Sequence, residues 1–220
     1  MWIYLDRNTP SQELVKTAEL PPSQNYVLGS HPHGVMSTGA FCNFTTDCND
    51  FSQRFPGLQP WLATLAGLFY LPVFRDYIMA SGWHCLALKK HKGFVCLALR
   101  HGASLVPVYS FGVNDTFKGM NFSKGSWQYL CQVTCKRVTS IAPCIFWGRG
   151  LFLHNSCGLL PLPMPITTVV GGPIPVPQCS SPSQEQVDHY HRLYMDALER
   201  LFEEHKESCG VPASTHLTFL

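Results

Sequence analysis

The sequence Asn25-Tyr-Val-Leu-Gly-Ser-His-Pro-His-Gly34 joins a short apolar run to a turn that carries two histidines. Residues 25–29 have the pattern of a short buried strand. The run leads at once into His31-Pro32-His33-Gly34, where proline and glycine force a turn. A rigid strand aims side chains and the loop after it leaves them accessible, so functional groups favour such positions. These ten residues therefore predict both a strand and a candidate site.

Further helices and strands are predicted after this turn. Residues 39–44 begin a helix, and residues 92–100 predict a second helix that Gly102 stops. Three apolar segments are predicted strands: residues 105–112, 142–147 and 166–170. Pro107 has no backbone N–H to donate, so it indicates that residues 105–112 form an edge strand or the start of a strand.

The last helix is the clearest element in the sequence. Ser183 followed by Gln186 predicts a capping box, and Gly210 and Pro212 predict the end of the helix. One face is apolar at helical spacing: Val187, Tyr190, Tyr194, Leu198, Leu201 and Phe202. The other face is polar: Glu199, Arg200, Glu203, Glu204 and Lys206. Alternating strands and helices predict an α/β sandwich with a long C-terminal amphipathic helix, formed as a single domain over residues 1–220.

Composition favours contact with lipid over contact with nucleic acid. Charged residues make up 14% of the chain, whereas soluble domains carry about 25%. The net charge of +2 argues against a nucleic-acid partner, for which a clustered basic stripe is expected. The basic run at residues 89–92 is either a solvated loop or a contact with anionic headgroups or a phosphate-bearing substrate.

No segment predicts a membrane-spanning helix or a signal peptide. Residues 55–74 are uncharged, but prolines and glycine interrupt them and the continuous apolar part is half of the ~20 residues that a span requires. A short buried helix or a segment in the membrane surface fits better.

The ten cysteines include no C-x-x-C pair, which argues against the commonest zinc and redox motifs. Reduced thiols are therefore expected.

The two histidines of the turn allow several chemistries. A histidine base could take a proton from a hydroxyl that attacks a thioester carbonyl, and backbone N–H groups around Gly34 could hold the oxyanion. A metal site would need a third ligand, for which Asp47, Asp50 and His101 are candidates. A purely structural turn, with the histidines bonded to backbone, is the third interpretation.

Two arginines are candidates for substrate binding. Arg149 lies between Gly148 and Gly150 in a flexible turn after a predicted strand, and such an arginine suits phosphate or pyrophosphate. A solvated surface arginine is the alternative. Arg75 directly follows the apolar segment, where an ion pair with Asp76 or a position at a membrane interface explains it as well as substrate contact does.

Several motifs together resemble the family of type-two diacylglycerol acyltransferases and monoacylglycerol acyltransferases. The resemblance covers nearly the whole chain and rests on motifs that occur in the family's order: Tyr26-Val-Leu-Gly-Ser-His-Pro-His-Gly34, Phe69-Tyr-Leu-Pro-Val-Phe-Arg-Asp-Tyr-Ile78, Leu97-Ala-Leu-Arg-His-Gly-Ala-Ser-Leu-Val-Pro-Val-Tyr-Ser-Phe-Gly112, Pro143-Cys-Ile-Phe-Trp-Gly-Arg-Gly150 and Pro165-Ile-Thr-Thr-Val-Val-Gly171.

This resemblance implies an acyl-CoA-dependent O-acyltransferase that acts on a mono- or diacylglycerol in lipid biosynthesis. It implies a place at the endoplasmic reticulum membrane and at lipid droplets, with acyl-CoA as co-substrate and neither a cofactor nor a metal. By resemblance, His31 and His33 are active-site residues with Gly34 beside them, and Arg149 and Gly150 form the family's R-G motif. We expect Arg149, Gly150 and Arg75 to bind substrate. The resemblance is also compatible with a homo- or hetero-oligomer.

The chain also departs from the family's pattern. Compared with that pattern, we expect the chain to be without the family's N-terminal membrane hairpin and, near residues 82–83, without an internal segment that carries a G-G-A-x-E-like motif. The family's F-G-E-N reads Phe111-Gly112-Val113-Asn114, so a carboxylate has become valine. These departures favour an alternative: a catalytically inactive, membrane- or droplet-associated remnant of a shortened gene copy. A metal hydrolase is a third and weaker hypothesis.

Overall fold

The computed structural model describes residues 12–32, 37–45, 49–61, 63, 92–119, 123, 125–139, 146–148 and 161–219. A four-stranded sheet forms the centre of this part of the chain, in the order β1-β6-β3-β2. The strands are β1 (Gln12–Lys16), β2 (Tyr26–His31), β3 (Ser104–Phe111) and β6 (Ile166–Val170). β2 runs parallel to β3 and β1 parallel to β6, whereas β3 and β6 are antiparallel. The predicted α/β class is confirmed.

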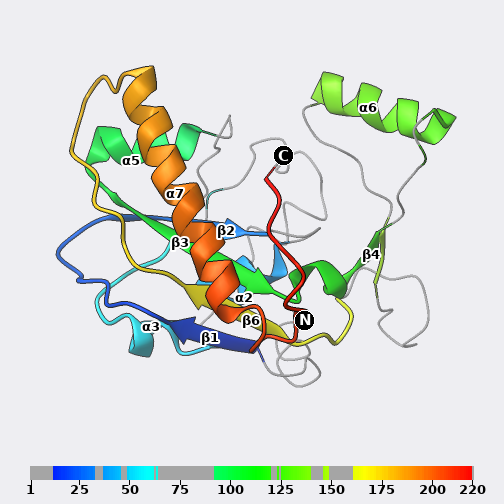
Figure 1. The fold of residues 1–220 in the computed structure, drawn as a ribbon, viewed down its shortest axis with the longest axis horizontal. Helices are drawn as coiled ribbons and strands as arrows, with labels where there is room; N and C mark the ends of the chain where they lie inside the picture. The colour runs from blue at the N-terminus through cyan, green and yellow to red at the C-terminus, as the bar shows by residue number, and fades with distance from the viewer. Residues whose placement is uncertain are drawn as a thin grey trace.

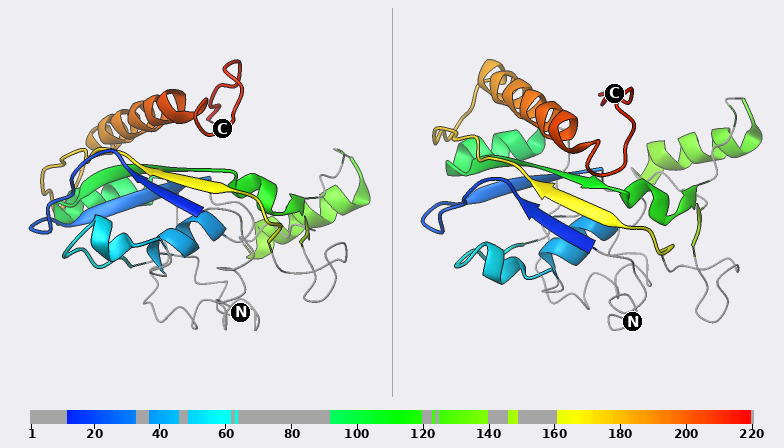
Figure 2. Two further views of the ribbon diagram at one scale, coloured as in Figure 1. Left: turned by 90° about the horizontal axis from the view of Figure 1, so that it is seen from below. Right: turned by 60° about the horizontal axis from the view of Figure 1, so that its bottom comes forward.

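Helices cover both faces of the sheet (Figures 1 and 2). Helices α2 (Thr38–Phe44) and α3 (Phe51–Arg54) lie on one face, and the long helix α7 (Gln184–His205) lies on the other. Helix α5 (Gly93–His101) packs against α7, β2 and β3. It ends as predicted at Gly102, which adopts a left-handed conformation with φ of 60°.

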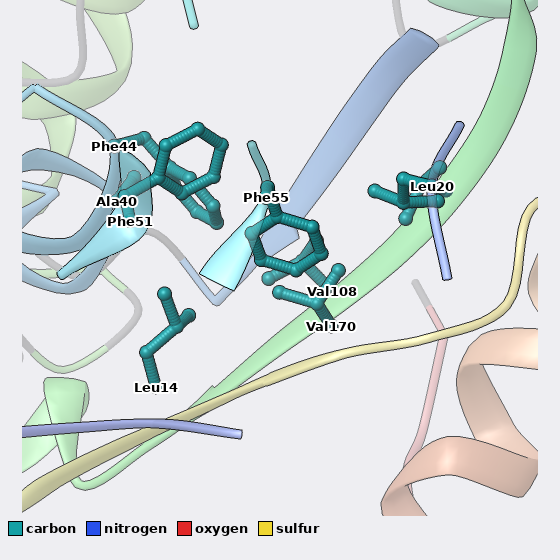
Figure 3. Packing of buried hydrophobic residues seen from close by; sticks show 9 residues of the cluster. Leu14, Leu20, Ala40, Phe44, Phe51, Phe55, Val108 and Val170 are labelled. Atoms are coloured by element: carbon teal, nitrogen blue, oxygen red, sulfur yellow. The ribbon is translucent and has the colours of Figure 1, made fainter. Parts of the chain in front are cut away.

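The core on the α2 and α3 face is built from aromatic and branched side chains (Figure 3). The ring of Phe44 meets that of Phe51 edge-on, with centroids 5.6 Å apart, and the ring of Phe51 lies tilted against that of Phe55 at 5.0 Å. They pack onto buried residues of three strands: Leu14, Val106, Val108 and Val170. Because these side chains are almost fully buried, the face contributes to stability through apolar burial.

The core on the opposite face joins α7 and α5 to β3. Tyr194 and Leu198 of α7 pack against Leu99 of α5 and Leu105 of β3. Side chains of β3 alternate between the two cores, as the period of two along a strand requires. This strand is buried on both faces, which explains its nearly continuous apolar sequence.

The prediction that Pro107 marks an edge or the start of a strand is wrong, because β3 lies between β2 and β6. Leu105 exchanges backbone hydrogen bonds with Ile174, and Val108 pairs with Val170. Three residues, 171–173, therefore lie between these two pairing positions on the side of β6, whereas β3 has only two residues between them. Proline is tolerated at such a bulge, and its carbonyl still accepts a 2.8 Å bond from the Gly171 N–H.

Helix α7 begins with the predicted capping box. The Ser183 hydroxyl accepts from the Gln186 N–H, and the Gln186 side chain accepts from the Ser183 N–H. The regular helix ends at His205, and turns continue to Gly210. The prediction that Lys206 belongs to the solvent face is wrong: this residue is 4% exposed. Lys206 keeps helical backbone angles as the C-cap and follows Phe202 by four residues, so helical spacing places it on the apolar side of α7.

Several elements were not predicted in full from the sequence. They are β1, α3, α6 (Trp127–Thr139) and the strands β4 (Lys118–Gly119) and β5 (Phe146–Trp147), which form a two-stranded ribbon. Of these, only β5 falls within a predicted strand. The ribbon follows the short helix η2 (Val113–Thr116).

Most of the uncharged run at residues 55–74 lies outside the described residues. Within the described ranges, no helix combines the length and apolar character needed to cross a membrane.

Candidate active site

The predicted histidine turn starts at the carboxyl end of β2. His31 is the last residue of that strand, lies opposite Tyr109 of β3 in the parallel register, and is exposed. Its ring meets the ring of Tyr194 edge-on, with centroids 6.0 Å apart. The description of the turn ends at Pro32, so His33 and Gly34 lie outside the described residues.

Tyr194 holds the strand that carries His31. Its side chain is 1% exposed, and its hydroxyl donates a 2.8 Å hydrogen bond to the Gly29 carbonyl. A Cβ atom at Gly29 would overlap with this hydroxyl, so only glycine leaves room for it. Burial raises the pKa of the Tyr194 phenol far above its ordinary value, which keeps the hydroxyl protonated as a donor. Sequence reasoning placed Tyr194 in the core but missed this link to the site.

The carboxyl end of β3 continues into a tight turn. Gly112 has a φ of 79° and passes so close to the Pro165 carbonyl that a side chain would overlap with it. Val113, where the resemblance predicts a carboxylate, is 1% exposed and its methyl group lies against Gly39 of α2. Val113 therefore contributes to the interior of the molecule and does not face the pocket described next.

A pocket of about 270 Å³ lies at this end of the sheet. Its lining includes Pro32 of the histidine turn, Tyr109 and Phe111 of β3, Phe202 of α7, and Thr215 and His216 of the C-terminal segment. Partial burial raises the pKa of the Tyr109 phenol, so Tyr109 is a neutral hydroxyl at physiological pH. Because ligands often bind beyond the carboxyl ends of parallel strands, this is the candidate substrate pocket.

The predicted substrate-binding residues are not described directly. Arg75, Arg149 and Gly150 all lie outside the described residues. The preceding Gly148 is buried, and β5 before it pairs with β4 through Lys118 opposite Trp147. Since β4 follows β3 after the short helix η2 and pairs with β5, the ribbon is joined to the carboxyl end of β3 by a short connection.

The metal hypothesis gains nothing from the structure. Across the described ranges, no three histidine, cysteine or acidic side chains gather in a way that could hold a metal ion. Of the three candidate ligands, Asp50 begins α3 and His101 ends α5, while Asp47 lies outside the described residues.

Comparison with known protein families decides the chain's relationship. The family model for diacylglycerol acyltransferase matches residues 2–85 and 79–220, which together span nearly the whole sequence. The chain belongs to the diacylglycerol acyltransferase family. The predicted family is confirmed, and with it the predicted descent from O-acyltransferases of glycerolipid synthesis.

Named members of the diacylglycerol acyltransferase family match at high identity. The chain is 54% identical to human 2-acylglycerol O-acyltransferase 3, across 100% of the chain and 82% of that protein. It is 42% identical to human diacylglycerol O-acyltransferase 2, across 96% of the chain and 64% of that protein, which is less than two thirds. It is 41% identical to diacylglycerol O-acyltransferase 2 of Xenopus laevis, across 100% of the chain and 71% of that protein. No solved structure matches the chain.

The alignment with human 2-acylglycerol O-acyltransferase 3 contains positions that have no counterpart in this chain. The match to human 2-acylglycerol O-acyltransferase 3 extends over 281 positions, whereas the chain has 220 residues. About 60 positions inside the aligned region therefore have no counterpart in this chain. The two segments matched by the family model overlap at residues 79–85.

Proposed function

We propose that this chain transfers a fatty acyl group from acyl-CoA to the free hydroxyl of a mono- or diacylglycerol. The observation that carries the proposal is 54% identity, over the whole chain, to a protein named as a 2-acylglycerol O-acyltransferase. The position of His31 at the end of a parallel strand, next to Pro32 in the wall of a pocket, supports it. Acyl-CoA is then a co-substrate, and no cofactor is required.

The proposed chemistry assigns the base to the histidine turn. One of His31 and His33 takes the proton of the acceptor hydroxyl, whose oxygen attacks the thioester carbonyl. Backbone N–H groups around Gly34 hold the oxyanion that forms. The carbon–sulfur bond then breaks, the new ester leaves, and coenzyme A takes up the proton as a free thiol. The reaction needs no covalent enzyme intermediate.

The proposed role of Arg149, Gly150 and Arg75 is to bind acyl-CoA. Coenzyme A carries phosphate groups, and the planar guanidinium of arginine binds phosphate with two parallel hydrogen bonds. A glycine beside Arg149 allows a phosphate to approach the backbone closely. Support comes from the short connection between β3 and the ribbon that precedes Arg149.

We also propose that residues 1–220 form one domain, an acyltransferase-like α/β sandwich with the amphipathic helix α7 on one face, from which a segment is missing near residues 82–83. The surplus of aligned positions in the relative and the overlap of the two matched ranges at residues 79–85 support this location. A missing strand removes hydrogen-bond partners from its neighbours, so the shortened chain is expected to be less stable than a full-length relative.

The alternative proposal is an inactive remnant that still binds the endoplasmic reticulum membrane or lipid droplets, alone or in a homo- or hetero-oligomer. Helix α6 favours membrane contact, because Trp127 is 71% and Leu130 59% exposed. Residues 116–184 contain five lysines and arginines and no acidic residue. An exposed apolar helix in a basic segment fits a surface of anionic lipid.

Acyl transfer in microsomes that lack related acyltransferases separates the two proposals. The chain is supplied with labelled oleoyl-CoA and either monooleoylglycerol or dioleoylglycerol, and His33→Ala is measured beside it. His189→Ala is the matched control, because His189 is exposed on α7, where its ring meets the ring of Tyr190. Labelled di- or triacylglycerol that disappears in His33→Ala alone supports the enzyme.

A well-expressed, membrane-bound chain that yields no labelled product contradicts the enzyme proposal and leaves the remnant. Product formed equally by the wild type and His33→Ala contradicts the assignment of the base. Protein that stays in the soluble fraction contradicts both proposals, since each requires contact with a lipid surface.

A further inference from the structure

The C-terminal segment folds back onto the end of α7 and is held there by Lys206. The Lys206 side chain is nearly buried, and its ammonium donates to the carbonyl oxygens of Ala213 and Thr215 at 2.7 and 2.9 Å. It also pairs with Glu203 at 2.6 Å. Three oxygen partners satisfy the three donors of the ammonium, so the position of residues 213–215 is closely defined.

This arrangement places His216 beside Glu203. The Nδ1 atom of His216 lies 3.0 Å from Oε1 of Glu203. The hydrogen bond from Lys206, and after it the one from His216, lowers the pKa of the Glu203 carboxyl, so the group is a carboxylate at neutral pH. A carboxylate can only accept, and Nδ1 must therefore carry the proton. In the neutral ring, Nε2 is then left with a lone pair that can accept a hydrogen bond.

His216 lies where a substrate could reach it. It lines the same pocket as Pro32 of the histidine turn, and its side chain is 71% exposed. The rings of Phe111 and Phe202 also line the pocket, although both residues are almost fully buried. Within the described ranges, Nε2 of His216 has no hydrogen-bond partner. A ligand that offers a free hydroxyl to Nε2, next to the exposed edges of these rings, would match this part of the pocket.

We infer that the His216–Glu203 pair binds the free hydroxyl of the acylglycerol acceptor, with His216 Nε2 accepting the hydroxyl's hydrogen bond. The inference rests on the proposed function for the identity of the acceptor, but it adds a residue that lies far from the histidine turn in sequence. Glu203 fixes the tautomer and orientation of the ring, and Lys206 fixes Glu203. His216 is thus an acceptor-binding residue, while the base remains in the turn.

Binding can be tested without turnover. The purified full chain, labelled with ¹⁵N-histidine, is titrated in one detergent with dioleoylglycerol, which has a free hydroxyl, and with trioleoylglycerol, which has none. The His216 ring signals, identified by their loss in His216→Ala, are expected to shift with dioleoylglycerol only. An equal response to both lipids, or a response to neither, overturns the inference.

Kinetics provide the second test. His216→Ala is expected to raise the KM for the acylglycerol by roughly 5- to 15-fold, the effect of one net hydrogen bond, with little change in kcat. His216→Gln, whose amide oxygen can accept from a hydroxyl, is expected to recover part of the loss. His189→Ala is the matched control, and thermal melts of all variants show whether each chain folds.

The two tests separate this inference from the proposed function. A chain without turnover whose His216 signals still respond to dioleoylglycerol alone supports the inference and contradicts the enzyme. An active chain in which His216→Ala behaves as His189→Ala does, in both KM and kcat, overturns the inference and leaves the enzyme standing.

Discussion

The hydroxyl of Tyr194 donates a 2.8 Å hydrogen bond to the carbonyl oxygen of Gly29, across 165 residues of sequence. This bond joins the middle of α7 to β2 two residues before His31. The ring of Tyr194 also packs edge-on against Phe94 of α5, with centroids 5.0 Å apart. A single buried tyrosine therefore connects both helices of one face to the strand that presents the histidine turn.

Removing only the hydroxyl isolates the contribution of this hydrogen bond. Tyr194→Phe is expected to lower the free energy of unfolding by about 1–2 kcal/mol, because the Gly29 carbonyl loses its side-chain partner. Tyr190→Phe is the control, since Tyr190 is half-buried on the same helix and its hydroxyl has no partner among the described residues. Urea denaturation of the two variants measures the difference, and equal midpoints would contradict the role of the bond.

Gly29 and Tyr194 are expected to be coupled energetically. Gly29→Ala places a methyl group onto the Tyr194 hydroxyl, so it is destabilising by roughly 2–3 kcal/mol, at the upper end of the effect of overpacking. In Gly29→Ala/Tyr194→Phe the hydroxyl is gone, and the double variant is expected to be less destabilised than the sum of the two single variants. A double-mutant cycle from denaturation data checks this, and simple additivity would show that the overlap is relieved elsewhere.

Local signals in the sequence predicted the elements that build the site. The run before His31 became β2, residues 166–170 became β6 with the predicted bounds, and Ser183 and Gln186 formed their capping box. Each of these depends on neighbouring residues only: apolar patterning for strands and side-chain bonds to the first helical N–H groups for the cap. Such features are therefore readable before any tertiary contact is known.

Features that depend on contacts between distant residues were missed. The bulge opposite Pro107 exists because residues 171–173, which follow β6, span a stretch where β3 uses one residue fewer. The Lys206 ammonium finds its two carbonyl partners because the C-terminal segment folds back. Neither contact has a local signature. The proximity of His216 to Glu203 also requires the turn between them, so no motif spacing indicated it.

Lys206 and Lys92 each form an ion pair with an acidic residue of α7, but they should differ in how much they contribute to stability. Lys206→Met leaves two carbonyls and Glu203 without their buried partner, and a decrease in Tm of roughly 4–8 °C is expected. Lys92→Met breaks a bond to Asp188 in which both side chains are well exposed, so its Tm is expected to change little. Hydrogen exchange of residues 211–217 should rise in Lys206→Met alone; protection that is unchanged there would contradict the holding role of Lys206.

The contribution of Asp188 should depend on pH. Hydrogen bonds from Lys92 and Gln184 lower the pKa of its carboxyl. A folded-state pKa below the unfolded value of about 3.9 stabilises the fold at higher pH, and this stabilisation is lost as the pH falls through the folded-state pKa. Because the pair is exposed and screened by solvent, Asp188→Asn is expected to lower Tm only slightly at pH 7 and to match the wild type in acid below that pKa. Asp196→Asn, at an exposed position of α7, is the control; a difference that persists in acid would point to packing.

Helix α6 should bind membranes through its exposed apolar residues. Trp127 and Leu130 lie three positions apart, so they occupy neighbouring positions on one side of the helix. Replacing both with serine removes apolar area that would otherwise enter the interface, and vesicle binding of the full chain is expected to fall by about tenfold or more.

Vesicle composition and a matched variant make this last prediction specific. Because residues 116–184 carry only basic charges, binding should be stronger to vesicles that contain phosphatidylserine than to phosphatidylcholine alone, and salt should weaken it. Leu193→Ser removes an exposed leucine from α7, outside this basic segment, and should leave binding unchanged. Equal losses in both variants would mean that apolar exposure in general, and not α6, holds the chain at the lipid surface.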